Sequence, residues 1–194
     1  MIKFNPIFKI LAKELALGRQ AVNKKLTLSN PSMDAGIKKN LEMDIKGNLG
    51  EIIAIDHLTK KGKSFEMAQM LSTHPEKSWD IKCGNKKIDV KTLYSDKKYS
   101  KNRLMINKDA HHKGKGVIDM YWFVIVENNT ATFKYVDYKE VESWNLAKNN
   151  KRDNGAISQY YYIDIRKWCY ENFFLYNTRN HINDFELWHN KVYN

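Results

Sequence analysis

The first sixty residues carry apolar positions at helical spacing. Apolar residues recur every three to four positions at Ile7, Phe8, Leu11 and Leu15. Asn5-Pro6 directly before them is typical of a helix start, so we predict a helix from residue 7 to about residue 25. A second helical pattern runs over residues 33–61, with an interruption expected near Gly47, and Gly62 suits a left-handed cap at its end.

After Gly62 the pattern changes to an alternation of apolar and polar residues, which is typical of strands. The predicted strands cover residues 64–70, 78–82, 87–93, 104–107, 121–127 and 132–137. The last two flank an Asn-Asn-Thr-Ala sequence, which indicates a hairpin. We then expect a short helix at 139–147, a polar loop at 148–155, a strand at 160–163 and helices at 164–176 and 183–192.

Helices followed by a run of strands and further helices predict an α/β fold with a mixed central β-sheet flanked by helices. We expect a single domain over residues 1–194, with a core at about 33–140 and helical additions at 1–30 and 160–194. Residues 160–176 include eight aromatic side chains. The spacing of their apolar positions favours a helix facing the core, with stacking on nucleotide bases as the alternative.

The stretch from Ser78 to Leu93 predicts a hairpin around Gly84 and Asn85, both of which accept a positive φ. The two-residue turn sets the opposed pairs Cys83–Lys86, Lys82–Lys87, Ile81–Ile88 and Asp80–Asp89. Opposed side chains share a face, and faces alternate along each strand. One face therefore carries Trp79, Ile81, Ile88 and Val90, and the other carries Ser78, Asp80, Lys82, Lys87, Asp89 and Lys91.

Two aspartates in opposed positions repel one another unless a cation lies between them. Neighbouring lysines are one source of positive charge, and a divalent metal such as Mg²⁺, which prefers oxygen ligands, is the other. An Asp-x-Lys pattern alone says little, because it recurs along the chain, for example at Asp44, Asp80, Asp89 and Asp137. An alternative set combines Asp80 and Lys82 with Glu66, but it leaves Asp89 unexplained. Glu51 is a further candidate acid, because it stands in an apolar helical stretch with the small residues Gly47, Gly50 and Ala54.

Charge is distributed unevenly along the chain. The 33 Lys and Arg residues against 22 Asp and Glu give a formal net charge of +11, and residues 82–115 hold most of the excess. Such a segment attracts polyanions, so a nucleic acid is the expected partner, although a merely basic surface also fits the charge. No apolar run approaches the roughly 20 residues that cross a membrane, and no secretion signal is evident, so we expect a cytoplasmic protein without membrane partners. The two cysteines, Cys83 and Cys169, form neither a disulfide framework nor a zinc motif.

Together, these residues resemble the PD-(D/E)xK nuclease superfamily, which has a restriction-endonuclease-like fold. The family pattern is a helix with a glutamate, a strand beginning with an aspartate, and a strand carrying (D/E)-x-K. The matching pieces are "GNLGEIIAIDHLTKKG" with Glu51, "SWD" with Asp80, and "IDVKT" with Asp89 and Lys91. The resemblance covers about residues 43–126, and it departs from the motif at Trp79, where the family name has proline.

The resemblance implies Mg²⁺-dependent hydrolysis of DNA phosphodiesters to 5′-phosphate and 3′-hydroxyl ends, with Mn²⁺ as a substitute metal. It assigns Asp80, Asp89, the Val90 carbonyl and Glu51 to the metal, and it assigns Lys91 to the attacking water or to charge on the phosphate. The expected nucleic-acid contacts are Lys82, Lys87, Lys97, Lys98, Lys101, Arg103, Lys108, Lys113 and Lys115. His111 and His112 are interpreted as loop residues without a catalytic role.

Several functions remain open within this interpretation. Small size favours a phage or mobile-element DNA-processing nuclease, while a restriction enzyme and a Holliday-junction resolvase use the same core. An RNA-directed nuclease is a further alternative, since the phosphate contribution is common to DNA and RNA. A binding module without catalysis is another, in which the carboxylates are structural. Cutting both strands together would need a homodimer, for which the aromatic C-terminal helices are the candidate surface.

Overall fold

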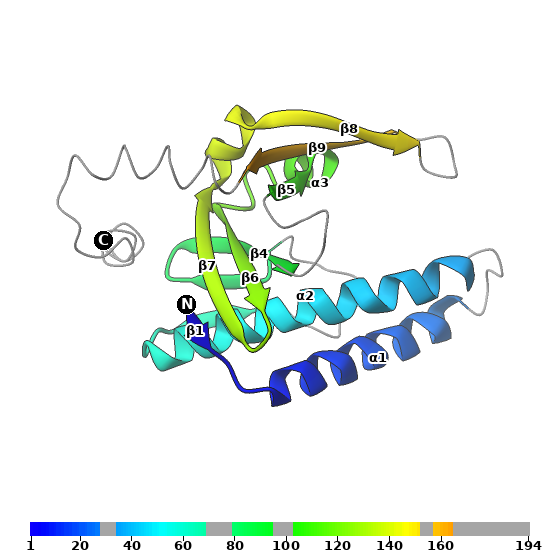
Figure 1. The fold of residues 1–194 in the computed structure, drawn as a ribbon, viewed down its shortest axis with the longest axis vertical. Helices are drawn as coiled ribbons and strands as arrows, with labels where there is room; N and C mark the ends of the chain where they lie inside the picture. The colour runs from blue at the N-terminus through cyan, green and yellow to red at the C-terminus, as the bar shows by residue number, and fades with distance from the viewer. Residues whose placement is uncertain (28–33, 69–78, 95–102, 152–156, 165–194) are drawn as a thin grey trace.

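The computed structural model describes residues 1–27, 34–68, 79–94, 103–151 and 157–164 (Figure 1). Two long helices lie near the N-terminus, α1 at Ile7–Thr27 and α2 at Asp34–Lys60. The strands are β1 (Ile2–Lys3), β2 (Phe65–Met67), β3 (Ile81–Cys83), β4 (Lys86–Tyr94), β5 (Arg103–Asn107), β6 (Met120–Glu127), β7 (Thr130–Asp137), β8 (Asn145–Lys151) and β9 (Ile157–Asp164). A short helix α3 (Lys108–Lys113) follows β5, and a 3-10 helix η2 (Tyr138–Ser143) follows β7.

The described strands form two sheets. The main sheet has the order β1-β7-β6-β4-β3-β2, and a small antiparallel sheet has the order β5-β9-β8. Within the main sheet β4 and β6 run parallel, whereas the other pairs are antiparallel. This arrangement confirms the predicted mixed α/β fold with helices packed on a mixed sheet.

Alternate residues of β6 face two different cores. Trp122 and Val124 pack toward α2, in a core that includes Leu49 and Ile53. Tyr121, Phe123 and other residues of the opposite face form a second core with the small sheet and η2. Figure 1 shows α1 and α2 side by side along one side of the main sheet and the small sheet at the other side. The period of two along β6 therefore explains why the strand joins both layers.

Local signals set most of the observed boundaries. The side chain of Asn5 accepts a hydrogen bond from the Ile7 N–H at 3.0 Å, as expected for the start of α1. Gly62 has φ +66°, which confirms the predicted left-handed cap after α2. Gly84 has φ +55° in the β3–β4 turn, and Asn128 has φ +54° in the β6–β7 turn. Both predicted hairpins are confirmed, although Gly84 alone of the Gly84-Asn85 pair takes a positive φ.

Two expectations about the helices were wrong. The buried face of α1 centres on Ala12 and Ala16, which are fully buried, whereas Ile7 and Leu11 are 48% and 45% exposed. Small side chains face α2 because the two helices pack closely, and the buried Asn48 side chain donates to the Ala12 carbonyl at 3.3 Å. The interruption predicted near Gly47 is also absent, since α2 is continuous through that position.

The segments after β4 differ more from the sequence interpretation. The helix predicted at 139–147 ends at Ser143, and β8 extends from there into the predicted polar loop, because β8 pairs with β9. The basic segment around residue 110 contains α3, whose first turn is capped by the Asn107 side chain. His111 and His112 therefore lie on a helix and not in a loop. The C-terminal helices predicted beyond Asp164 lie outside the described residues, as does the dimer surface assigned to them.

Gly50 permits the closest approach between α2 and the sheet. A Cβ atom added there would lie 1.9 Å from the Thr92 Oγ1 atom on β4, whereas one added at Gly47 would meet nothing within 4 Å. Because the β-branched Thr92 side chain cannot easily rotate away, Gly50→Ala is expected to destabilise the protein by about 1–3 kcal/mol. Gly47→Ala, the matched control, should stabilise it by up to about 1 kcal/mol through helix propensity. Urea unfolding of both variants measures this difference, and equal effects would contradict the packing assignment.

Candidate active site

The candidate site lies where β3 stops pairing with β4. The ladder contains Cys83–Lys86, Lys82–Lys87 and Ile81–Ile88, which confirms the predicted register at the turn. The fourth predicted pair is not part of it, because the Asp80 N–H donates to the Ile88 carbonyl at 2.9 Å. Beyond Ile88, no described strand pairs with β4 on this side. Among the described residues, this edge of β4 is lined by side chains and not by a neighbouring strand.

The Asp80 carboxylate takes the place of the missing backbone partner. Its Oδ2 atom accepts a hydrogen bond of 2.7 Å from the Val90 N–H. Burial raises the pKa of Asp80 well above its usual value, and the negative charges of Asp89 and Glu51 raise it further. The Val90 hydrogen bond and Lys91 oppose this increase. Asp80 is thus held at the strand edge, where the nearby positive charge does not offset its burial and the charges of the neighbouring carboxylates.

Asp89 and Lys91 follow on the same face of β4, as predicted. The Lys91 Nζ atom lies 2.5 Å from the Asp89 Oδ1 atom, and the two side chains are 36% and 15% exposed. Burial alone would lower the pKa of Lys91, but the carboxylates of Asp89, Asp80 and Glu51 together raise it above its ordinary value. Lys91 is therefore an ammonium group over the whole neutral range, and it is the cation at the centre of the acidic cluster.

Glu51 joins this cluster from α2. Its neighbour Gly50 lies against Thr92 of β4, so the helix backbone is close to the strand that carries Asp89 and Lys91. Burial raises the pKa of Glu51 to about 7, with a contribution from Asp89, while Arg19 and Lys91 act in the opposite direction. The four residues that the sequence selected, from α2, from the position directly before β3 and from β4, thus influence one another's pKa values.

Arg19 is a member of the site that the sequence interpretation missed. It lies on α1 three residues after Ala16, on the side that packs against α2, and its guanidinium is 3.9 Å from the Asp44 carboxylate. Its charge is also the main influence that lowers the pKa of Glu51. The Ala12–Ala16 stripe marks this face of α1 in the sequence. Only the pairing of α1 with α2 shows that an arginine on it reaches the acidic cluster.

The oxygen donors of the cluster fit a hard divalent cation held by two carboxylates. Among the described residues, no three His, Cys, Asp or Glu side chains are close enough to hold a metal ion together. Asp80 lies at the edge of β4 to which the Val90 N–H points, and the charge of Asp89 raises its pKa. The Val90 carbonyl faces the same edge, because the N–H and C=O groups of a strand residue point the same way. Mg²⁺ typically uses one or two carboxylates and several waters, so this set fits Mg²⁺ without Glu51 as a direct ligand.

In the alternative set, Glu66 and Lys82 form an ion pair with each other. Glu66 and Lys82 are opposed residues of β2 and β3, and their side chains form an ion pair of 2.9 Å. Glu66 is exposed on an outer strand. This pair is therefore an ordinary surface contact, and the structure favours Glu51 over Glu66 as the upstream acid beside Asp80.

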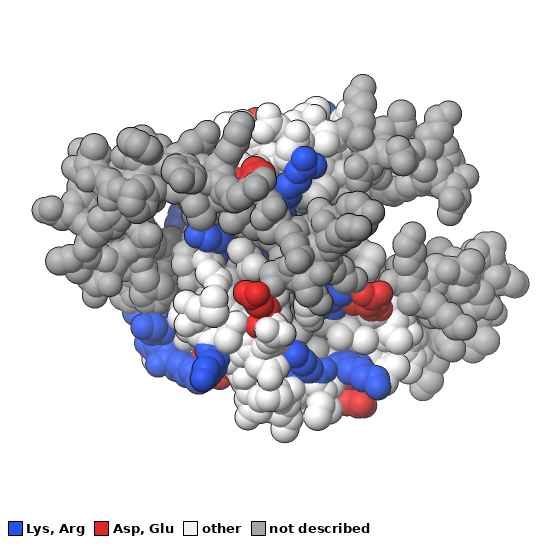
Figure 2. Space-filling view, in the orientation of Figure 1, with Lys and Arg blue, Asp and Glu red and all other residues white. Residues whose placement is uncertain are grey.

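The predicted nucleic-acid contacts are spread over several elements. Lys87 lies on β4, Lys108 donates to Gln159 at 3.0 Å, and Arg103 stacks 4.8 Å from the ring centre of Tyr162. Lys113, the last residue of α3, and Lys115, two residues further on, are both exposed. Lys97, Lys98 and Lys101 lie outside the described residues. Figure 2 shows described Lys and Arg side chains in separate groups on the visible face, with no single continuous basic patch there.

Comparisons with protein-family models, curated proteins and solved structures find no match to this chain. None of the described helices is long and apolar enough to span a membrane. The class of protein must therefore be inferred from the site itself.

Proposed function

We propose that this protein is a Mg²⁺-dependent DNA endonuclease of the PD-(D/E)xK type, built on a restriction-endonuclease-like core. One observation carries the proposal: Glu51, Asp80 and the Asp89–Lys91 ion pair influence one another's pKa values, and Asp80 is held on β4 by the Val90 N–H. They come from a helix, a strand start and the next strand, in the order of the family motif. The net charge of +11 supports a polyanionic substrate.

The proposed mechanism gives each residue a distinct role. Asp80, Asp89 and the Val90 carbonyl would hold Mg²⁺, and Glu51 would contact the metal indirectly, through a water molecule. The metal, when bound, activates a water molecule and polarises the scissile phosphate. Lys91 carries a positive charge, since its pKa is raised, so stabilising charge that develops on the phosphate is a better role for it than proton abstraction. Arg19 keeps Glu51 more acidic than burial alone would allow.

A binding module without catalysis is the second candidate. It is favoured by the finding that no three acidic, His or Cys side chains group around a metal position in the described part of the chain. In that case the Lys91–Asp89 ion pair would itself neutralise the Asp89 charge, and no metal ion would bind there. This candidate predicts salt-sensitive nucleic-acid binding without metal-dependent cleavage.

Cleavage assays separate these functions. Plasmid, branched and flapped DNA, and an RNA of matched sequence, are incubated with the protein in Mg²⁺, in Mn²⁺ and in EDTA. We expect metal-dependent DNA cleavage, reduced by about 100-fold or more in Asp89→Asn and in Lys91→Met, because each removes charge needed in the transition state. Preferred cleavage of the RNA would assign an RNA-directed nuclease, and preferred cleavage of branched DNA would favour a resolvase-like role.

Asp137→Asn and Lys139→Met are the matched controls for this assay. They alter a second Asp-x-Lys sequence whose two charged side chains are both exposed, at the end of β7 and in η2. Both controls should cleave at the wild-type rate. Equal cleavage by wild type, Asp89→Asn and Lys91→Met would refute the proposal, since a contaminating nuclease would then explain the activity.

A further inference from the structure

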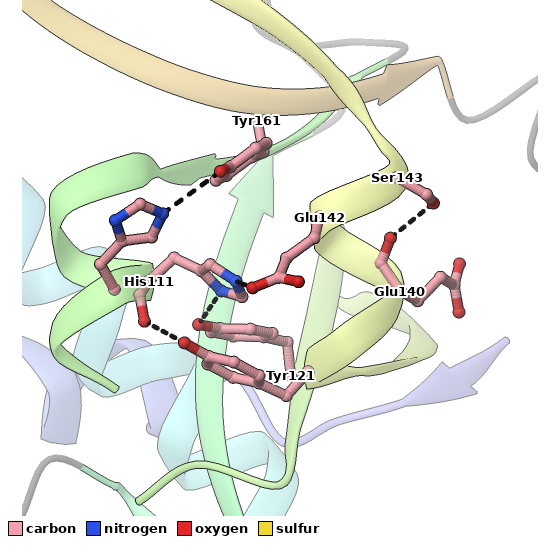
Figure 3. A network of polar contacts seen from close by, with 8 residues as sticks. His111, Tyr121, Glu140, Glu142, Ser143 and Tyr161 are labelled. Carbon is pink, nitrogen blue, oxygen red and sulfur yellow. Dashed lines mark hydrogen bonds and ion pairs between the residues drawn. The ribbon is translucent and has the colours of Figure 1, made fainter. Parts of the chain in front are cut away.

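A buried network of polar contacts lies on the face of the main sheet that carries Asp89, and the proposed mechanism does not use it (Figure 3). Its centre is His111 of α3, which is fully buried. The His111 Nδ1 atom is 3.0 Å from the Tyr121 hydroxyl oxygen. The Tyr138 ring stacks on the imidazole at a centroid distance of 4.0 Å, and its hydroxyl donates to the His111 carbonyl. His111 is thus fixed from two sides by tyrosines.

The two nitrogens of His111 have different surroundings. The Nε2 atom faces the Glu142 Oε1 atom at 3.9 Å, which is too long for a hydrogen bond, and has no closer partner within the described residues. Nδ1 and the Tyr121 hydroxyl share a hydrogen bond, whose direction depends on the tautomer of the imidazole. Burial lowers the pKa of His111, which keeps the imidazole neutral at pH 7.

Tyr121 connects this network to the candidate site. In the parallel β4–β6 ladder Tyr121 is the direct partner of Asp89, and Phe123 is the partner of Lys91. Residues in register on neighbouring strands project to the same face, so the Tyr121 ring flanks the Asp89 side chain. Tyr121 is 1% exposed, and the negative charge of Asp89 contributes to its raised pKa, after burial. The buried Tyr121 ring therefore lies on the same face of the sheet as the Asp89–Lys91 pair, next to Asp89.

We propose that Tyr121 is a positioning residue for Asp89, and that His111 holds Tyr121 in place from α3. The inference rests on the proposed nuclease function and deepens it. Without the hydrogen bond to His111, the Tyr121 ring would be restrained by packing alone. Asp89 would then lose its fixed neighbour, and the metal-binding and transition-state geometry would loosen. Groups that orient a metal-binding residue typically change metal affinity or activity by about 10- to 100-fold.

Two tyrosine-to-phenylalanine variants form a matched pair for this inference. Tyr121→Phe and Tyr138→Phe each remove one buried hydroxyl that contacts His111. Only Tyr121 lies opposite Asp89 in the ladder. The two variants should therefore lose similar amounts of thermal stability, and only Tyr121→Phe should affect the site.

The experiment measures kcat and KM for DNA cleavage and, separately, Mn²⁺ binding by titration calorimetry. For Tyr121→Phe we expect kcat to fall about 10-fold with KM nearly unchanged, and Mn²⁺ affinity to fall by a similar factor. His111→Leu should reproduce these losses, and the double variant should show no further decrease in kcat. Tyr138→Phe should stay within about twofold of wild type in both measurements.

Equal values of kcat and Mn²⁺ affinity for Tyr121→Phe and Tyr138→Phe would overturn the inference, because a general loss of stability would then account for both. Asp89→Asn is measured beside them. If Asp89→Asn abolishes cleavage while the two tyrosine variants behave alike, the positioning role fails and the nuclease function stands. If Asp89→Asn cleaves like wild type, the nuclease function fails, and the positioning role fails with it.

Discussion

Glu51→Gln is expected to be more stable than the wild-type protein at pH 8, by about 2–3 kcal/mol in the absence of metal. The pKa of Glu51 is raised from 4.5 to about 7 in the folded protein, mainly by burial. Below pH 4.5 the carboxyl is protonated in both states and has no effect on stability. Between pH 4.5 and 7 the unfolded chain releases the proton first, so wild-type stability falls as the pH rises. Above pH 7 the full cost of the buried charge is present.

Urea unfolding from pH 4 to pH 9 in EDTA measures this effect. The two proteins should be nearly equal at pH 4 and should diverge as the pH rises. Some decline should remain in Glu51→Gln, because Asp80 also has a raised pKa. Glu14→Gln is the control, since Glu14 is an exposed residue of α1. If Glu51→Gln and Glu14→Gln have parallel pH profiles, Glu51 is not part of a buried acidic cluster.

Asp80→Asn is expected to lose DNA cleavage by about 1,000-fold while remaining folded. Its amide oxygen can still accept the hydrogen bond from the Val90 N–H, so the edge of β4 keeps its partner. The negative charge that would hold the metal is lost, and the rise in Tm that Mg²⁺ gives to the wild type should disappear. Without metal the variant should be more stable than wild type near neutral pH, because burial of the Asp80 charge is costly.

Asp80→Ala provides the contrast. It removes both the charge and the acceptor, so the Val90 N–H loses its partner, and this variant should be less stable than Asp80→Asn by about 1–3 kcal/mol. Thermal unfolding with and without Mg²⁺, together with the cleavage assay, separates the two roles of Asp80. An Mg²⁺-dependent rise in Tm that persists in Asp80→Asn would exclude Asp80 as a metal-binding residue.

The sequence predicted the mixed α/β fold and the register of the first hairpin, whereas the role of the candidate site stays a prediction. The hairpin register follows from local chemistry, because Gly84 fixes the turn and the alternation of Ile88 and Val90 with charged residues fixes the faces. The alternation of residues does not indicate that the ladder stops at Ile81, since the Asp80 carboxylate competes with a backbone group for the Val90 N–H. That outcome depends on the energies of two alternative hydrogen bonds at one position.

The features that were missed depend on contacts distant in sequence. β8 forms because residues 157–164 provide a partner strand, although its own sequence is polar. Arg19 reaches the acidic cluster only because two helices with alanine at their interface pack closely. His111 is buried by tyrosines from β6 and η2, which no local pattern could indicate. Local turn and helix-cap signals were therefore reliable, whereas the neighbours of each element could not be derived from spacing.

The half-paired edge of β4 has a consequence for solubility as well as for chemistry. A strand edge with unpaired backbone groups can recruit a strand from another molecule and begin aggregation, and charged side chains at the edge are a common protection. Here Asp80 occupies the Val90 N–H, and Asp89 and Lys91 add charges beside it. Within the part of the chain that the structure describes, the residues proposed for catalysis would thus also protect this edge from self-association. Removing their charges in one step would leave a strand edge with fewer charges facing its own copies.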